Sequence, residues 1–225
     1  MTGPEKLHEK IELYKKLPDK YQITHEWYAQ LLAGHERVHM SNQKELHIKP
    51  EDPRVIVELG IYEGASSVWW SDHFLDHPES KLICVDPFTG NEEYLEEENR
   101  TNFPTLDKIQ CIARHNLQKS KNPGKITVLP GASWDMFSTV SQIIKDRPID
   151  ILYVDGEHTT QAVIRDAMLY VPLVKPGGLV IFDDYGHEDV RRGCDKALTA
   201  LDCMQRAVFT GWQLWCAKRT NIEEA

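Results

Sequence analysis

The stretch VELGIYEGASS (57–67) decides the fold, because it joins a buried apolar run to a segment with helical character. Gly60 and Gly64 permit a tight turn and let backbone N–H groups approach a ligand closely. The start of the helix that follows favours negative charge. Such glycine patterns are common, so the loop predicts a ligand-binding unit only together with the sequence around it.

Downstream of this loop, short β-rich runs alternate with segments of helical length, which is typical of a sheet covered by helices. Several runs are continuously apolar, as strands buried on both faces must be. Lys175-Pro176-Gly177-Gly178 is expected to form the turn before the fifth strand. The predicted strands are 54–59, 81–86, 125–130, 149–155 and 178–184, and the predicted helices are 64–77, 133–145, 159–171 and 187–202.

The segment RAVFTGWQLWCAKR (206–219) predicts a C-terminal antiparallel hairpin that turns at Thr210-Gly211. The fold class is therefore α/β: a Rossmann-like, doubly wound, mostly parallel seven-stranded sheet with an antiparallel C-terminal hairpin strand. Residues 1–53 contain no comparable strand and predict two helices, 5–17 and 22–40, that form a helical cap or substrate lid. Residues 54–220 are expected to form a single globular unit.

Composition excludes several classes of protein. With 225 residues, 41% hydrophobic and 27% charged, the chain predicts one sizeable globular domain. The formal charge of −9 disfavours general binding to nucleic acid or to anionic membranes. Five cysteines without a CxxC pair, no apolar run of membrane-spanning length and a polar N-terminus indicate a cytoplasmic protein. The glutamate-rich segment 91–98 is interpreted as a solvated loop or helix face.

Two acids lie at the ends of predicted strands near the glycine loop. A carboxylate such as Glu58 is costly in a buried strand unless it holds a donor or a cation. Asp86 ends the next strand, where a carboxylate can accept both hydroxyls of a ribose, although it could also serve as a turn residue before Pro87. The E-x-G-x-x-x-G spacing and the negative charge of Glu58 disfavour a pyrophosphate-containing dinucleotide, and with it a nicotinamide dehydrogenase.

These features resemble the class I S-adenosylmethionine-dependent methyltransferases, in particular the metal-dependent catechol-type and macrocin-type (sugar) O-methyltransferases. The resemblance covers about residues 54 to 218 and makes residues 54–220 the S-adenosylmethionine-binding domain. The loop VELGIYEGAS matches the family's first motif, and GASWD (131–135) matches the segment that borders the adenine. The cofactor-binding residues that the resemblance implies are Glu58, Gly60, Tyr62, Gly64, Ser66, Asp86, Ser133 and Trp134. Trp134 fits a core aromatic equally well.

Three aspartates follow two neighbouring predicted strands: Asp155 after the fourth, Asp183 and Asp184 at the end of the fifth. In a parallel sheet these ends meet at the ligand-binding edge, and three carboxylates there repel one another unless a cation lies among them. Oxygen ligands are typical of Mg²⁺, or of Ca²⁺ or Mn²⁺. The sequence therefore predicts a metal site, with Asp155 expected to border the cofactor as well. The alternative is that one aspartate caps a helix and the others face solvent.

Two residues just after Asp155 are candidates for the catalytic base: Glu157 and His158. Matched by motif, His158 falls where catechol-type enzymes have a lysine, and Glu157 falls where sugar-modifying enzymes have an acid. His158 is favoured because imidazole titrates near neutrality. Both residues could instead simply begin the helix at Thr159.

The resulting hypothesis is an O-methyltransferase that uses S-adenosylmethionine and Mg²⁺ and acts on a hydroxyl of a small sugar-containing or catechol-like molecule. Two alternatives stay open: a metal-independent small-molecule O- or N-methyltransferase, and a non-catalytic binding protein that keeps the fold. No nucleic-acid or membrane partner is expected, and a homo-oligomer is compatible with the sequence.

Overall fold

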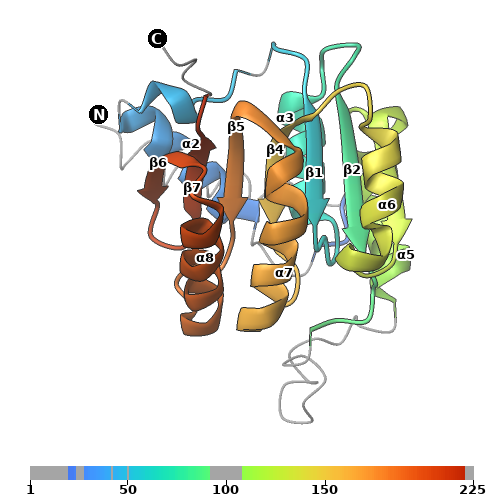
Figure 1. The fold of residues 1–225 in the computed structure, drawn as a ribbon. Coiled ribbons are helices and arrows are strands. Elements are labelled where there is room, and N and C mark those ends of the chain that lie inside the picture. Colours follow the sequence, from blue (N-terminus) through green and yellow to red (C-terminus); the bar gives the residue numbers. More distant parts are fainter. Residues whose placement is uncertain (1–19, 24–27, 42, 50, 92–107, 221–225) are drawn as a thin grey trace.

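The computed structural model describes residues 20–23, 28–41, 43–49, 51–91 and 108–220. Its centre is a seven-stranded sheet with the strand order β3-β2-β1-β4-β5-β7-β6 (Figure 1). The strands are β1 (Val55–Leu59), β2 (Lys81–Asp86), β3 (Ile126–Pro130), β4 (Ile149–Val154), β5 (Val174–Phe182), β6 (Met204–Phe209) and β7 (Leu214–Lys218). The chain reverses its direction of winding between β1 and β4, so a crevice forms at the carboxyl ends of these two strands.

The first five strands are parallel, and β7 joins them antiparallel to β5. Strands β1 and β4 are buried at every residue, which explains why their sequences, apart from Glu58 and Asp150, are apolar without alternation. Strand β3 lies at the edge and is partly exposed, so its sequence mixes apolar and polar residues.

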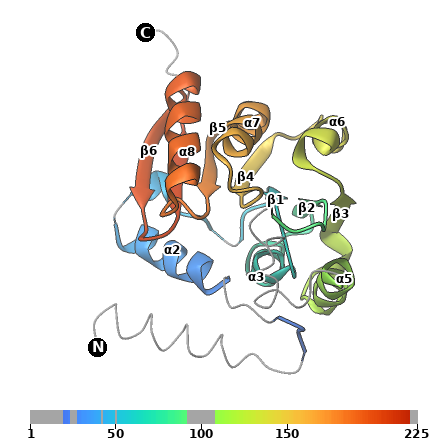
Figure 2. The ribbon, with the colours of Figure 1, turned by 90° about the horizontal axis from the view of Figure 1, so that it is seen from below.

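Helices cover both faces of the sheet (Figure 2). Helices α2 (Tyr28–Met40), α3 (Ala65–Phe74) and α5 (Ile109–Lys119) lie on one face, where Trp70 and Trp215 are fully buried in the core. Helices α6 (Ser133–Ile143), α7 (Thr160–Tyr170) and α8 (Glu188–Leu201) cover the other face. Burying a large apolar side chain of this kind contributes roughly 1.5–3 kcal/mol. Short 3₁₀ helices η1 (Lys44–Leu46), η2 (Pro123–Lys125) and η3 (Val171–Leu173) complete the described elements.

The structure confirms the predicted fold class, including the C-terminal hairpin, and four of the five predicted parallel strands agree within about one residue. Two details were wrong. Helix α5 was not predicted, because its sequence IQCIARHNLQK lies in a long polar connection. The segment Lys175–Gly178 lies within β5 rather than before it, at an irregularity in the pairing with β4. The helix expected at 5–17 lies outside the described residues, and α2 occupies the second half of the one expected at 22–40.

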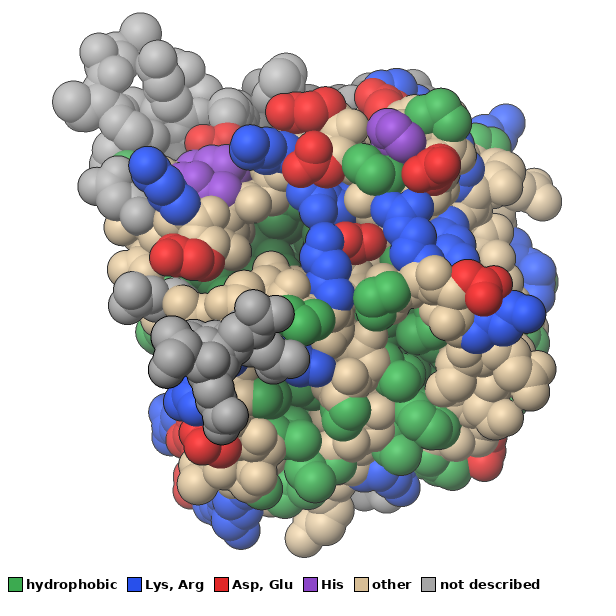
Figure 3. Space-filling view, turned by 45° about the horizontal axis from the view of Figure 1, so that its top comes forward, with side chains coloured by type: hydrophobic (Ala, Val, Ile, Leu, Met, Phe, Trp, Pro, Cys, Tyr) green, Lys and Arg blue, Asp and Glu red, His purple; other side chains and the backbone are tan. Residues whose placement is uncertain are grey.

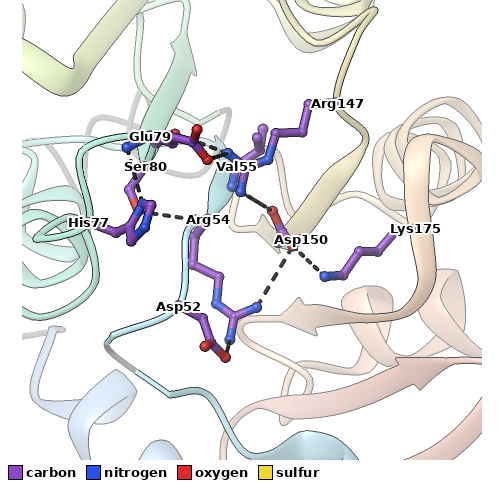
Figure 4. A network of polar contacts seen from close by, with 9 residues as sticks. All are labelled: Asp52, Arg54, Val55, His77, Glu79, Ser80, Arg147, Asp150 and Lys175. Carbon is purple, nitrogen blue, oxygen red and sulfur yellow. Dashed lines mark hydrogen bonds and ion pairs between the residues drawn. The ribbon is translucent and has the colours of Figure 1, made fainter.

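The amino-terminal edge of the sheet carries a compact network of charged side chains. Figure 3 shows Lys and Arg side chains gathered on this side of the molecule around an acidic group. The acid at its centre is Asp150, which is 6% exposed and accepts a hydrogen bond from Val55 N at 2.7 Å. Lys175 approaches Asp150 to 2.5 Å, Arg54 to 3.8 Å and Arg147 to 3.9 Å (Figure 4). The network ties β1, β4 and β5 together at their starts.

In the part of the chain that the structure describes, no helix is both long and apolar enough to cross a membrane.

Candidate active site

A cavity of about 970 Å³ opens at the carboxyl ends of β1, β2, β4 and β5. Of the residues predicted from the sequence, ten line it: Gly60, Tyr62, Asp86, Ser133, Trp134, Asp155, Glu157, His158, Asp183 and Asp184. The other three, Glu58, Gly64 and Ser66, are buried behind its wall. The topology thus brings together residues that are up to 124 positions apart, from Gly60 to Asp184.

Gly60 has a geometric role at the floor of the cavity. Its φ of +82° lies in the left-handed region, and a Cβ at this position would lie 1.9 Å from the carbonyl oxygen of Asp155. No other residue fits between β1 and the end of β4 at this separation. Gly64 (φ +80°) forms the N-cap of α3. The glycine loop therefore closes the sheet edge and directs α3, whatever ligand it also contacts.

Glu58 points away from the cavity, beneath the first turn of α3. Its Oε2 accepts a hydrogen bond from Ser67 Oγ at 2.5 Å, and Cys84 Sγ lies 3.8 Å away. Its Oε1 has no hydrogen-bond partner among the described residues. Complete burial raises the pKa of Glu58 to about 7. An acid held in this way carries a proton at mildly acidic pH and loses it readily when a cationic group approaches.

Asp86 holds the loops that form one wall of the cavity. Its Oδ2 accepts hydrogen bonds from the backbone N–H groups of Ile61 (2.6 Å) and Tyr62 (2.9 Å), and Oδ1 accepts one from Phe88 N (2.6 Å). Burial raises the pKa of Asp86, although these backbone N–H groups oppose the rise. Asp86 thus acts as a turn residue and also lines the cavity, so the two roles considered for it are compatible.

The wall formed by α6 and α7 carries the predicted adenine-side residues. Ser133 Oγ donates a hydrogen bond to Asp166, a buried acid whose pKa is raised to about 6 by burial. Trp134 is 46% exposed, and the Arg165 guanidinium lies 3.5 Å from its ring centroid in a cation–π contact. Trp134 is therefore not a core residue, and its ring faces the solvent side of the cavity.

The three predicted metal aspartates lie together at the ends of β4 and β5. Burial, followed by the charges of Asp183 and Asp184, raises the pKa of Asp155 well above its usual range. The pKa of Asp183 is raised to about 6, again by burial and by Asp184. Tyr153 OH donates a hydrogen bond to Asp183 Oδ2. Asp183 is thus held by a neighbour, whereas Asp155 experiences mainly repulsion.

Asp184 contacts the candidate base. His158 Nε2 lies 3.0 Å from Asp184 Oδ2, and this contact lowers the pKa of Asp184 even though burial acts to raise it. Potential ligand atoms of Asp155, His158 and Asp184 all lie within 4.8 Å of one another. Glu157 Oε1 accepts a hydrogen bond from the His158 backbone N–H at 3.0 Å. The structure therefore places His158, rather than Asp183, beside the other two candidate ligands.

The donor chemistry of this cluster fits a divalent cation. Two carboxylates suit Mg²⁺, Ca²⁺ or Mn²⁺, while an imidazole ligand would shift the preference toward a transition metal. The unusually high pKa of Asp155 has a clear physical cause, namely three acids packed together in a buried site. A cation between Asp155 and Asp184 would remove that repulsion, with His158 either as a third ligand or as a base.

Several cavity residues escaped sequence analysis, and the most informative is Trp212. Its Nε1 donates a hydrogen bond to Asp184 Oδ1 at 2.5 Å. The antiparallel register explains the contact: Phe182 pairs with Leu214, so the residue two before Leu214 meets the residue two after Phe182. A prediction of the pairing between β5 and β7 would have been the signal for the contact between Trp212 and Asp184. Arg165, Asp166 and His187 line the cavity as well.

Comparisons with known proteins agree with this geometry. A family model described as "Methyltransferase domain" matches residues 57–185, which is more than half of the chain. Uncharacterized protein R132 of Acanthamoeba polyphaga mimivirus is 32% identical over 138 residues, 60% of this chain and 53% of R132. The chain thus spans about half the length of this curated relative.

Solved structures share the fold. The O-methyltransferase NovP has a TM-score of 0.57 at 18% identity, covering 85% of this chain and 79% of NovP. The MycE methyltransferase from the mycinamycin biosynthetic pathway, in complex with Mg, SAH and mycinamycin VI, has a TM-score of 0.53 at 16% identity, covering 96% of this chain and 54% of MycE. The chain therefore belongs to the methyltransferase-domain family and has the class I fold of S-adenosylmethionine-dependent methyltransferases.

Proposed function

We propose that the protein transfers a methyl group from S-adenosylmethionine to a hydroxyl of a small molecule, with Mg²⁺ or a similar divalent cation at Asp155 and Asp184. The observation that carries the proposal is the charge of the cavity. Arg165 is the single Lys or Arg among the described residues that line it. Six acids line it as well: Asp86, Asp155, Glu157, Asp166, Asp183 and Asp184. Such a cavity favours cationic ligands, and a sulfonium cofactor together with a metal ion supplies them.

The cofactor half of the cavity lies between the glycine loop and α6. Gly60 and Tyr62 would face the methionine part, Asp86 would accept from the ribose, and Ser133 and Trp134 would border the adenine. Glu58 lies beneath α3, and its negative charge, once it ionises, would stabilise the positive charge of the bound cofactor. MycE, a neighbour in fold, is in complex with SAH, the demethylated product of this cofactor, which supports the assignment.

The acceptor half lies at Asp155, His158 and Asp184. A bound divalent cation would lower the pKa of an acceptor hydroxyl and orient its oxygen. His158, which lies 3.0 Å from Asp184, would take the hydroxyl proton as the oxygen attacks the methyl carbon and the sulfonium sulfur leaves with its electron pair. The Asp184 carboxylate would then stabilise the imidazolium that forms.

The acceptor is proposed to be a small hydroxylated molecule. MycE is in complex with mycinamycin VI and Mg, and NovP is an O-methyltransferase, so neighbours in fold support hydroxyl chemistry on compact molecules. We also propose that residues 1–53 form a cap whose role is acceptor choice, because α2 contacts the C-terminal hairpin that lines this half of the cavity.

A methyl-transfer assay tests the proposal directly. The full chain is incubated with methyl-labelled S-adenosylmethionine and a panel of catechols and glycosides, with Mg²⁺ or with EDTA. Labelled product that requires both the cofactor and the metal supports the proposal. Transfer that is unaffected by EDTA would favour the metal-independent alternative. Calorimetry that detects no cofactor binding would favour a non-catalytic binding protein.

A further inference from the structure

The turn of the β6–β7 hairpin is linked to both consecutive aspartates at the end of β5. Trp212 Nε1 donates to Asp184 Oδ1 at 2.5 Å. Its neighbour Gln213 is fully buried and donates from Nε2 to Tyr153 OH at 3.4 Å, and Tyr153 OH in turn donates to Asp183. Trp212 therefore holds Asp184 directly, whereas Gln213 reaches Asp183 through Tyr153. This pairing fixes the acceptor side of the cavity from an element far away in the sequence.

The indole of Trp212 is held in place but remains accessible. A Cβ at Gly186 would lie 3.0 Å from Trp212 Cε3 and Cζ3, so the ring packs closely against the backbone at Gly186. Trp212 is nevertheless 40% exposed and lines the cavity, together with the rings of His158 and His187, whose centroids are 6.1 Å apart. A flat apolar surface is thus presented beside Asp184.

The position of the turn depends on α2. Arg37 Nη1 donates a hydrogen bond to the carbonyl oxygen of Thr210. Gly211 has a φ of +101°, and a Cβ there would lie 2.4 Å from Arg37 Nη1. Arg37 therefore occupies the space that a side chain at residue 211 would need. The amino-terminal helix is linked in this way to the residue that borders the acceptor.

We propose that Trp212 is a specificity-determining residue with two separable roles: its N–H positions Asp184, and its ring is the wall against which the acceptor packs. The inference rests on the proposed function and assigns the acceptor class: a hydroxylated molecule that presents the face of a ring to the indole. Packing of that ring on Trp212 would bring a ring hydroxyl toward Asp184 and His158. Catechol and methyl α-mannopyranoside, one a planar and the other a saturated ring diol, represent the two kinds of ring.

Two substitutions separate the roles. Trp212→Phe keeps a ring and removes the N–H donor, whereas Trp212→Gln keeps an N–H donor and removes the ring. The full chain is loaded with S-adenosylhomocysteine, Mn²⁺ affinity is measured by electron paramagnetic resonance, and binding of catechol and of methyl α-mannopyranoside is measured by calorimetry. Met168→Ala, at an exposed site on α7 that does not line the cavity, is the control.

We expect Trp212→Phe to weaken Mn²⁺ binding about tenfold, because the carboxylate loses a charge-assisted hydrogen bond, and to retain diol binding. Trp212→Gln should retain Mn²⁺ binding and weaken diol binding about fivefold. The diol that binds more tightly to the wild type shows whether the acceptor ring is planar, as in catechol, or saturated, as in a sugar. Equal effects of both variants on both ligands, or wild-type behaviour in both, would overturn the inference while the proposed function stands.

Two wild-type results complete the test. Binding of S-adenosylhomocysteine and Mn²⁺ without binding of either diol would overturn the acceptor class alone. Failure of the wild type to bind S-adenosylhomocysteine would overturn the proposed function, and the inference with it.

Discussion

The two edges of the sheet treat buried acids in opposite ways. At the amino-terminal edge, Asp150 has three cationic neighbours and a backbone hydrogen bond (Figure 4). At the carboxyl edge, Asp155 is partly buried and lies among other carboxylates, with His158 as the neighbour that lowers its pKa. The first arrangement is complete and stabilises the fold. The second is incomplete without a cation, which indicates that it is maintained for binding rather than for stability.

The largest expected effect comes from breaking the carboxyl edge. Asp155→Asn should lower turnover at least about a hundredfold, because a metal ligand is lost. The melting temperature measured without metal should stay the same or rise, since the substitution removes repulsion among buried acids. Activity assays and thermal unfolding of the same preparation check both results. A strongly destabilised Asp155→Asn protein would show that this edge is structural.

The opposite result is expected at the amino-terminal edge. Asp150→Ala removes the common partner of Lys175, Arg54 and Arg147 and the acceptor for Val55 N. The free energy of unfolding should fall by about 3 kcal/mol, as for other broken buried ion pairs. Turnover per folded molecule should not change, because Asp150 lies at the far end of the strands. Urea titration and kcat measured on the folded fraction test this contrast.

A smaller, pH-dependent effect is expected at Glu58, a fully buried acid that belongs to neither group. Its folded pKa of about 7 exceeds the ordinary value of 4.5, so the folded state binds the proton more tightly. The contribution of Glu58 to stability is therefore complete below pH 4.5 and is lost as the pH rises toward 7. Glu58→Gln should unfold with a flatter pH dependence over this window and be more stable than the wild type at pH 8. If the melting temperatures of the wild type and Glu58→Gln changed with pH in parallel, the raised pKa of Glu58 would be contradicted.

The smallest effect should come from Trp134, on the adenine side of the cavity. Trp134→Ala removes an exposed ring and with it the cation–π contact with Arg165. Binding of S-adenosylhomocysteine should weaken about fivefold, with no change in stability, because the ring is not part of the core. Calorimetry measures the affinity. Unchanged binding would place the adenine elsewhere in the cavity.

Much of the fold could be predicted because each signal was local. Continuous apolar runs such as residues 151–154 identify strands buried on both faces, and the order of elements implies a doubly wound sheet. Helix α5 was missed although Ile109, Ile112, Ala113 and Leu117 have helical spacing, because it lies in the long polar connection between β2 and β3. The bulge at Lys175–Gly178 also escaped, since glycine and proline indicate a turn equally well.

The residues of the candidate site could be predicted where they directly follow a parallel strand. Asp155, Asp183 and Asp184 follow parallel strands, so the sheet necessarily brings them together. Trp212 could not be found in the same way, because its contact with Asp184 depends on the register of an antiparallel pair. Glu58 was identified as costly, but the sequence does not show on which face of the sheet it lies. A contact that depends on strand register, or on the face of the sheet where a side chain lies, becomes visible only in the folded structure.

The central claim is that the acids at the carboxyl edge are neutralised by bound cations. The most direct test is the shift in melting temperature on adding Mg²⁺ to the wild type, Asp155→Asn and Asp150→Ala, each already saturated with S-adenosylmethionine. We predict a clear rise for the wild type and for Asp150→Ala, from its lower starting point, and little or none for Asp155→Asn. No rise in the wild type, or an equal rise in Asp155→Asn, would contradict the claim.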